Sequence, residues 1–469
     1  MRSIICQRLL CLGIFLAAVG FVTSSVVAQP DRLNVVLIMA DDLNTDLGCY
    51  GRADIKTPQI DRLAARAMRF DRAYCQYPVC NPSRAALLSG KRPESSGVID
   101  NATPARSKLA KAVFLPQHFR KQGYRTLKVG KISHTGDAFE DPASWDTDIR
   151  ETRAAKNPPE EQIAKKLPGN GIVLNAADAD TWDGFVARQG VEQLDSVVAS
   201  KQPFFLAIGF RRPHTPYIAP QKYFDLYPPA AISFLDEPAE HLARIPSLAL
   251  TYRHGGKQLD AKTRPIVASA YHASLSFIDA QIALILDALD RHDLWKNTVV
   301  IFVSDHGYHL GEHGGLWHKM TLFEEATRVP LLVAAPGVKP GTSSPRLVEL
   351  VDLYPTLVEL CQLPAVAGLE GQSFVPLLSK PDRPWKKGAF SVVGRGGDAG
   401  KPLDPRQLGR TIRTEQWRYT KWHDGRAELY DHESDSRELD NLADEAAHHQ
   451  IAAGLDRQLK AGWQEAKAK

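Results

Sequence analysis

Residues 34–42 of the chain are Asn-Val-Val-Leu-Ile-Met-Ala-Asp-Asp, an apolar run that ends in two aspartates. A run of this length and composition predicts a strand buried on both faces, as in a parallel sheet covered by helices. Asp41 and Asp42 follow it, and the carboxyl end of a strand is where open α/β sheets bind ligands. The segment therefore predicts both a fold class and the place of a functional site.

Similar apolar runs recur along the chain and alternate with helical patterns. Further strands are expected at 125–129, 204–209, 299–304 and 331–334. Thr57 and Pro58 begin a helix whose apolar stripe continues to Met68, and a longer helix is expected at about 265–290. This alternation predicts an α/β fold with a large, mostly parallel sheet flanked by helices.

The pattern changes from about residue 385. Short β-type segments are separated by polar turns and followed by a helix near 445–464; the segments are 411–413, 418–422 and 428–430. They predict a small antiparallel sheet closed by a helix. Because 380–384 is a proline-marked linker, we expect a catalytic domain over 29–384 and a smaller C-terminal subdomain over 385–469.

The amino-terminal residues have the layout of a secretory signal peptide. Arg2 and Arg8 precede an apolar run from Leu9 to Val22, and small residues follow at 26–28. We expect a signal peptide at 1–28 and export to the periplasm, the medium or a lysosome-like compartment, depending on the host. A retained membrane anchor is the alternative. No later segment is apolar enough to span, so stable membrane insertion is not expected.

Charge and cysteine content exclude several classes of protein. The 58 basic and 54 acidic residues are too balanced to favour nucleic acid as a partner. Removal of the leader leaves four cysteines, too few for a disulfide framework in an exported chain of 469 residues. No Cys-x-x-Cys pair supports a structural zinc site. The remaining cysteines are Cys49, Cys75, Cys80 and Cys361.

Polar residues follow three of the predicted strands. Asp41 and Asp42 follow the first, Lys131 and His134 the second, and Asp305 and His306 the strand at 299–304. Carboxylate oxygens suit a hard divalent cation such as calcium. For either pair alone, turn formation or helix capping is the competing interpretation; their shared place at one sheet edge favours a site.

The segment 78–90, Pro-Val-Cys-Asn-Pro-Ser-Arg-Ala-Ala-Leu-Leu-Ser-Gly, adds a reactive group. Pro82 fits the first turn of a helix, which would place Cys80 just before it and Arg84 one turn inside. A helix amino-terminus suits an anionic substrate because its N–H groups are free. By itself, Cys80 would also fit a small buried hydrophobe or an ordinary reactive thiol.

These residues resemble the sulfatase family. Cys80-x-Pro82-x-Arg84 with Leu88-Ser89-Gly90 is similar to the signature whose cysteine is oxidised to formylglycine, and 123–134 is similar to a second signature. The resemblance extends from about Asn34 to Leu442, and the segments 212–216, 304–307 and 311–314 are most similar to the iduronate-2-sulfatase branch. Asn81, Ser89 and Ser133 depart from the usual signatures.

The resemblance implies an alkaline-phosphatase-like fold and a sulfuric ester hydrolase acting on a sulfated carbohydrate, with a 2-sulfated uronate as the leading candidate. It also implies maturation of Cys80 by a formylglycine-generating enzyme. One calcium ion would be held by Asp41, Asp42, Asp305, His306 and the oxidised Cys80. Lys131 and Lys319 would hold sulfate oxygens, and His214 would protonate the leaving alcohol. Arg84 and His134 would position the formylglycine hydrate.

Two other functions remain open at this stage. A phosphomonoesterase or phosphodiesterase on the same broad fold would commonly use serine or threonine with two metals, although some phosphonate hydrolases also carry formylglycine. A catalytically inactive carbohydrate-binding relative would lack the nucleophile or the metal ligands. All of those residues are present in this chain.

Overall fold

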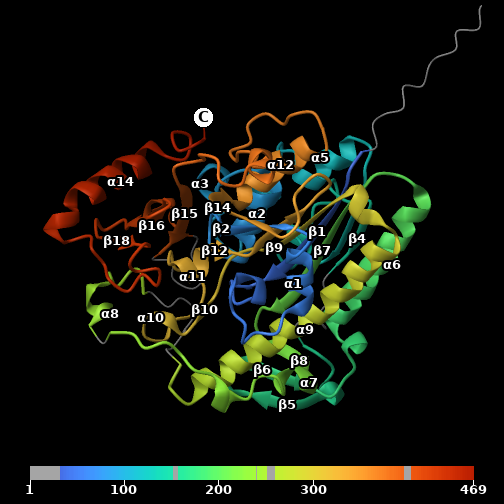
Figure 1. Ribbon diagram of the computed structural model, residues 1–469, viewed down its shortest axis with the longest axis horizontal. Coiled ribbons are helices and arrows are strands. Elements are labelled where there is room, and N and C mark those ends of the chain that lie inside the picture. Colours follow the sequence, from blue (N-terminus) through green and yellow to red (C-terminus); the bar gives the residue numbers. More distant parts are fainter. Residues whose placement is uncertain (1–31, 151–156, 239, 251–258, 396–402, 469) are drawn as a thin grey trace, which may run out of the picture.

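The computed structural model describes residues 32–150, 157–238, 240–250, 259–395 and 403–468 (Figure 1). The predicted signal peptide at 1–28 therefore lies outside the described residues.

A large mixed sheet forms the centre of the molecule, in the order β4-β3-β7-β1-β9-β13-β2-β12, with β14 paired to the other side of β2. Its strands are β1 (Asn34–Asp41), β2 (Met68–Tyr74), β3 (Arg125–Gly130), β4 (Thr147–Ile149), β7 (Phe204–Pro213), β9 (Thr298–Ser304), β12 (Arg328–Val329), β13 (Leu331–Ala334) and β14 (Thr342–Glu349). Strands β9, β1, β7, β3 and β4 run parallel, whereas β13 is antiparallel to β9. The prediction of a mostly parallel sheet is confirmed for the half that carries the candidate site.

Helices cover both faces of this sheet, and β1 shows why. Its alternate side chains point to opposite faces. Val36 and Ile38 pack with α1 (Pro58–Ala64), α6 (Trp182–Ser200) and α9 (Thr263–Arg291). Val35 and Leu37 pack with α2 (Cys80–Ser89), α5 (Leu115–Lys121) and α12 (Leu353–Leu360). The continuous apolar run is thus buried on both sides, as predicted.

The prediction of a helix from Thr57 through Met68 is wrong in its length. It ends at Ala64, and Met68 begins β2. The apolar stripe continues past the helix because Met68 and Phe70 are also buried, but within the sheet. Pairing of β2 with β13 and β14 therefore overrides the helical spacing.

The prediction that no later segment is apolar enough to span a membrane also needs correction. Helix α9 is long and apolar enough by length and composition alone. It is nevertheless mostly buried within the protein, packed against α6 and the sheet. Its apolar character is therefore explained by its place in the core.

The carboxyl-terminal part forms a four-stranded antiparallel sheet with one long helix, as expected. Its elements are β15 (Ala389–Gly394), β16 (Leu408–Arg413), β17 (Trp417–Lys421), β18 (Ala427–Asp431) and α14 (His449–Ala461). The helix is shorter than the expected 445–464 and packs Leu455 against Ile412 and Leu429. The boundary near residue 385 stays a prediction.

Shorter elements complete the structure. They are β5 (Ile163–Leu167), β6 (Gly171–Leu174) and β8 (Tyr217–Pro220), which form a small sheet; β10 (His309–Leu310) and β11 (Trp317–His318), which pair; and the short helices α3 (Pro93–Ser96), α4 (Ala105–Lys108), α7 (Gln221–Phe224), α8 (His241–Arg244), α10 (Glu312–Gly315), α11 (Glu324–Thr327) and α13 (Val375–Ser379).

Candidate active site

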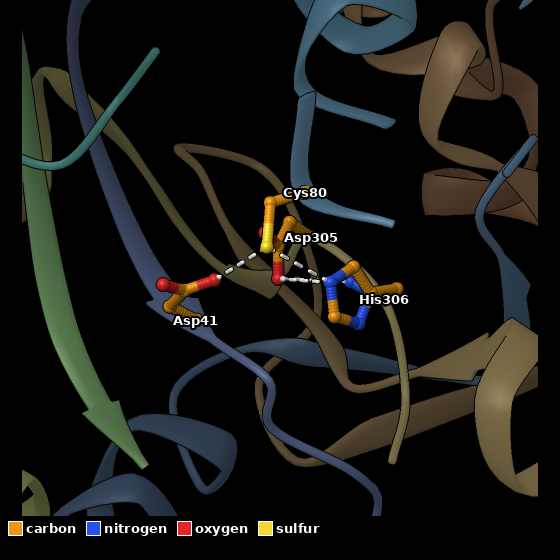
Figure 2. A group of neighbouring side chains, drawn as sticks. All are labelled: Asp41, Cys80, Asp305 and His306. Atoms are coloured by element: carbon orange, nitrogen blue, oxygen red, sulfur yellow. Dashed lines mark hydrogen bonds and ion pairs between the residues drawn. The ribbon is translucent and has the colours of Figure 1, made fainter. Parts of the chain in front are cut away.

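The site lies where the parallel strands end. Asp41 is the last residue of β1, Lys131 follows β3 directly, and Asp305 follows β9 directly. Because these strands run parallel within one sheet, with β7 between β1 and β3, their carboxyl ends lie at the same edge. Figure 2 shows the result: Asp41, Cys80, Asp305 and His306 point toward one another.

Cys80 reaches this edge from α2. The helix begins at Cys80 itself after an extended Val79, so the expectation that Cys80 precedes the helix is wrong by one residue. Its Sγ lies 3.4 Å from Asp41 Oδ1 and 3.4 Å from His306 Nε2. The side chain is buried, and burial together with the charge of Asp41 raises the pKa of the thiol. A thiol held protonated is a poor nucleophile, which disfavours the interpretation of Cys80 as an ordinary reactive thiol.

Three buried carboxylates surround Cys80. Candidate ligand atoms of Asp41, Cys80, Asp305 and His306 all lie within 4.8 Å of one another. Asp42 contributes to a second such group and has a left-handed backbone, with φ 65°. Its Oδ2 atom is buried without a hydrogen-bond partner. Because an oxygen in this state is costly unless something binds it, the donor set fits a hard cation.

Basic side chains offset this negative charge. Lys131 contacts the Asp41 carboxylate, and Lys319 contacts that of Asp42. Burial by itself would raise the pKa of Asp41, but Lys131, His214, Arg84 and Lys319 hold it well below its usual range. The Asp41 carboxylate therefore stays ionised although it is removed from water.

Arg84 lies among the carboxylates and does not hydrogen-bond to Cys80. Its Nε atom donates to Asp305 Oδ2 at 2.8 Å, and its Nη2 atom lies 3.5 Å from Asp41 Oδ1. Its Nη1 atom donates to the backbone carbonyl groups of Lys131 and Ile132. Arg84 thus ties the end of β3 to the end of β9.

Lys319 lies in the loop after β11. Its Nζ atom lies 3.5 Å from Cys80 Sγ. His318 and Met320, its two neighbours, both have left-handed backbones, with φ of 83° and 76°. Such strained backbone tends to be retained where it positions a functional group.

The two histidines predicted to act on the substrate or the nucleophile, His214 and His134, differ in their surroundings. His214 is partly buried, and its Nε2 lies 4.0 Å from Asp42 Oδ2. Its Nδ1–H donates to the carbonyl of Thr215, which leaves Nε2 directed at the site. His134 packs edge-on against Phe139, and its Nδ1 is buried without a hydrogen bond. Burial and the charge of Lys131 lower the pKa of His134 to about 3.

Several residues around the site were not expected from the sequence. Tyr271 of α9 donates to the carbonyl of Asp42 at 2.9 Å. Ser83 donates to the carbonyl of Asp305, and the hydroxyl of Ser304 accepts from the amide of Leu43 at 3.0 Å. Tyr271 lies within an apolar helical pattern that predicts only a core residue, so no local signal marks it. These contacts fix the backbone that carries the carboxylates.

Comparison with known proteins gives a consistent result. The family model described as Sulfatase matches residues 33–363, and one described as the C-terminal part of N-sulphoglucosamine sulphohydrolase matches 311–465. A sulfatase of Formosa agariphila is 32% identical, covering 88% of this chain and 84% of the relative. Iduronate 2-sulfatase of Homo sapiens is 30% identical over 89% and 90%, and choline-sulfatase of Rhizobium meliloti is 30% identical over 88% and 82%.

Solved structures show the same fold. Phosphonate monoester hydrolase of Agrobacterium radiobacter superposes with a TM-score of 0.79 at 23% identity, covering 92% of this chain and 95% of the other. A structure described as a 2-O GAG sulfatase gives 0.74 at 21% identity, covering 93% and 92%. At these identities the likeness establishes the fold alone, and it confirms the predicted alkaline-phosphatase-like architecture.

Proposed function

The chain belongs to the sulfatase family and is a sulfuric ester hydrolase, and we propose that it removes sulfate from a sulfated carbohydrate through Cys80 oxidised to formylglycine, with one calcium ion. The observation that carries this proposal is the buried cluster of Asp41, Cys80, Asp305 and His306, whose candidate ligand atoms lie within 4.8 Å of one another. A cysteine among carboxylates, with a raised thiol pKa, suits conversion to an oxygen group better than use as a thiolate.

The Sγ atom of Cys80 marks the position that the oxygen of formylglycine would take. In its hydrated form that aldehyde supplies one hydroxyl to attack sulfur and a second to expel sulfate afterwards. The amino-terminus of α2 and Lys319 adjoin this position and favour an anionic sulfate.

Calcium suits the surrounding donors. Asp41, Asp42, Asp305 and His306 would hold it together with the modified Cys80, and Asp42 Oδ2, which lacks a hydrogen-bond partner, is a ready ligand atom. A bound divalent cation would offset charge on the sulfate oxygens. Lys131 and Lys319, which contact Asp41 and Asp42, would then be free to bind those oxygens.

His214 is our candidate for the proton donor to the leaving alcohol. Burial lowers the pKa of His214 well below its usual value, and the Asp41 charge opposes this effect. The free enzyme therefore holds His214 neutral near pH 7. The negative charge of a bound sulfate would favour its protonation, which is the state that an acid requires.

The substrate class rests on the named relatives. Two iduronate 2-sulfatases are 30% and 31% identical to the chain, which favours a 2-sulfated uronate. Choline-sulfatase at 30% identity makes a small alkyl sulfate the second candidate. Sulfate release from defined glycosaminoglycan and algal oligosaccharides, choline sulfate and an aryl sulfate decides between them. Activity confined to choline sulfate or aryl sulfates would overturn the carbohydrate proposal.

Export and maturation belong to the same proposal. The leader-like residues 1–28 support export, and the Cys80 signature supports modification by a formylglycine-generating enzyme of the host. Expression with and without such an enzyme, followed by peptide mass analysis, tests the second point. Amino-terminal sequencing of the mature protein tests the first.

A further inference from the structure

A groove of about 450 Å³ lies in the carboxyl-terminal part. We call it the C-terminal groove. Its lining residues come chiefly from α14, the sheet strands β15 to β17 and the short helix α3, whose places in the fold are labelled in Figure 1. The residues of its wall that matter here are Arg410, Lys421, His423, Lys460, Trp422 and Trp463. Its volume falls in the range of ligand pockets in proteins, roughly 300–1,000 Å³.

This groove is separate from the active site. Cys80 is the first residue of α2, whereas Arg92 and Pro93, which line the groove, follow the carboxyl end of that helix. Ten helical residues span about 15 Å at 1.5 Å per residue. The groove therefore lies at the opposite end of α2 from the nucleophile, roughly 15 Å away.

The rim of the groove carries cations that are held only loosely. Arg410 donates to Glu94 at 2.7 Å, and both side chains are more than 40% exposed. Lys460 pairs with Asp456 and is 75% exposed. Exposed pairs of this kind contribute little, so an anion can compete for the basic groups. Among these groove side chains three are basic and two are acidic. The basic ones are Arg410, Lys421 and Lys460, and the acidic ones are Glu94 and Asp456.

Aromatic side chains line the inner wall of the groove, and most of them are buried. Trp422 and Phe390 are buried, and Trp422 donates its indole N–H to Glu428 at 3.1 Å. Trp463 follows Gly462, whose left-handed backbone, φ 82°, turns the chain at the end of α14. The Arg92 guanidinium packs 5.1 Å from the Trp463 ring centre and is itself paired with Glu349. Aromatic rings with basic neighbours suit a ligand that has both apolar ring faces and negative groups.

We propose that the C-terminal groove binds a sulfated saccharide unit of a glycan chain, apart from the unit that is cleaved. The basic rim contacts sulfate groups, and the partly exposed ring of Trp463 contacts the sugar. This inference extends the proposed carbohydrate function: an enzyme acting on a polymer gains affinity when a second unit is held nearby. It requires no covalent step.

The test compares two double variants of the full-length chain. Arg410→Gln/Lys421→Gln removes two basic groups of the groove. Arg291→Gln/Lys296→Gln removes two exposed, carboxylate-paired basic groups near the start of β9, at the other end of the parallel strands. The two variants have equal net charge, so a general electrostatic effect would be the same for both.

Binding of heparin, hyaluronan and neutral dextran is measured by titration calorimetry, together with turnover of an aryl sulfate. We expect the groove variant to bind heparin about fivefold more weakly than the matched control, with aryl sulfate turnover unchanged. Equal heparin affinity of the two variants overturns the proposal, as does binding of hyaluronan or dextran as tight as that of heparin. If the groove variant binds heparin more weakly than the control but the enzyme desulfates no glycan, the groove proposal stands. The proposed carbohydrate substrate is then refuted.

Discussion

Replacement of Arg84 by glutamine should be among the most destabilising single changes near the site. The side chain is only 1% exposed, and it donates to Asp305 and to two backbone carbonyl groups. Removal of one partner of a buried ion pair costs about 3–5 kcal/mol because the other charge stays buried. Each carbonyl left without a donor adds about 1–3 kcal/mol, of which the glutamine amide recovers a part. We therefore expect the free energy of unfolding to fall by at least about 4 kcal/mol.

Urea unfolding followed by circular dichroism, in the presence of a reductant, measures this change. Arg62→Gln is the control, since Arg62 also pairs with two aspartates but is 34% exposed. Exposed pairs contribute about 0–1 kcal/mol, so the control should barely move the unfolding midpoint. If Arg84→Gln lowers stability no more than Arg62→Gln does, the claim that Arg84 offsets buried carboxylates is wrong.

Two further predictions concern the metal and the pH dependence of stability. Chelation should abolish sulfate release, and calcium should restore it; recovery only with two zinc ions per chain would favour the phosphatase alternative. Asp279 of α9 accepts from the amides of Gln59 and Ile60, and burial raises its pKa to about 7 from 3.8. A raised carboxyl pKa means that the folded state binds more protons, so stability should fall by up to about 4 kcal/mol as pH rises from 4 to 7. Asp279→Asn should flatten that slope in urea titrations; an unchanged slope would assign it to other groups.

The aspartates proposed as metal ligands could be predicted because they lie at the carboxyl ends of strands that are clear in the sequence. The apolar runs before Asp41 and Asp305 are long enough to locate their ends within a residue, and parallel pairing then brings the ends together. Cys80 was located equally well because Pro82 marks the first turn of α2. In each case a local signal and a rule of sheet geometry are sufficient.

Other features depend on tertiary contacts that no local sequence pattern indicates. Strand β2 was missed because the helical stripe was followed through Met68, although Met68, Arg69, Phe70 and Asp71 alternate apolar and polar as in a half-buried strand. Its register is set by β13 and β14. Tyr271 resembles any core residue of α9, yet its hydroxyl supports the backbone at Asp42. The place of Arg84 between two strand ends likewise follows from tertiary packing.

The central claim is that the nucleophile is an aldehyde made from Cys80, and peptide mass analysis of active protein tests it most directly. Preparations that differ in the extent of modification are assayed for sulfate release, and the mass of the peptide containing Cys80 is measured in each. We predict that activity rises in proportion to the fraction carrying formylglycine, and that Cys80→Ala has none while keeping the fold. Full activity from protein whose Cys80 peptide retains an unmodified thiol would contradict the account.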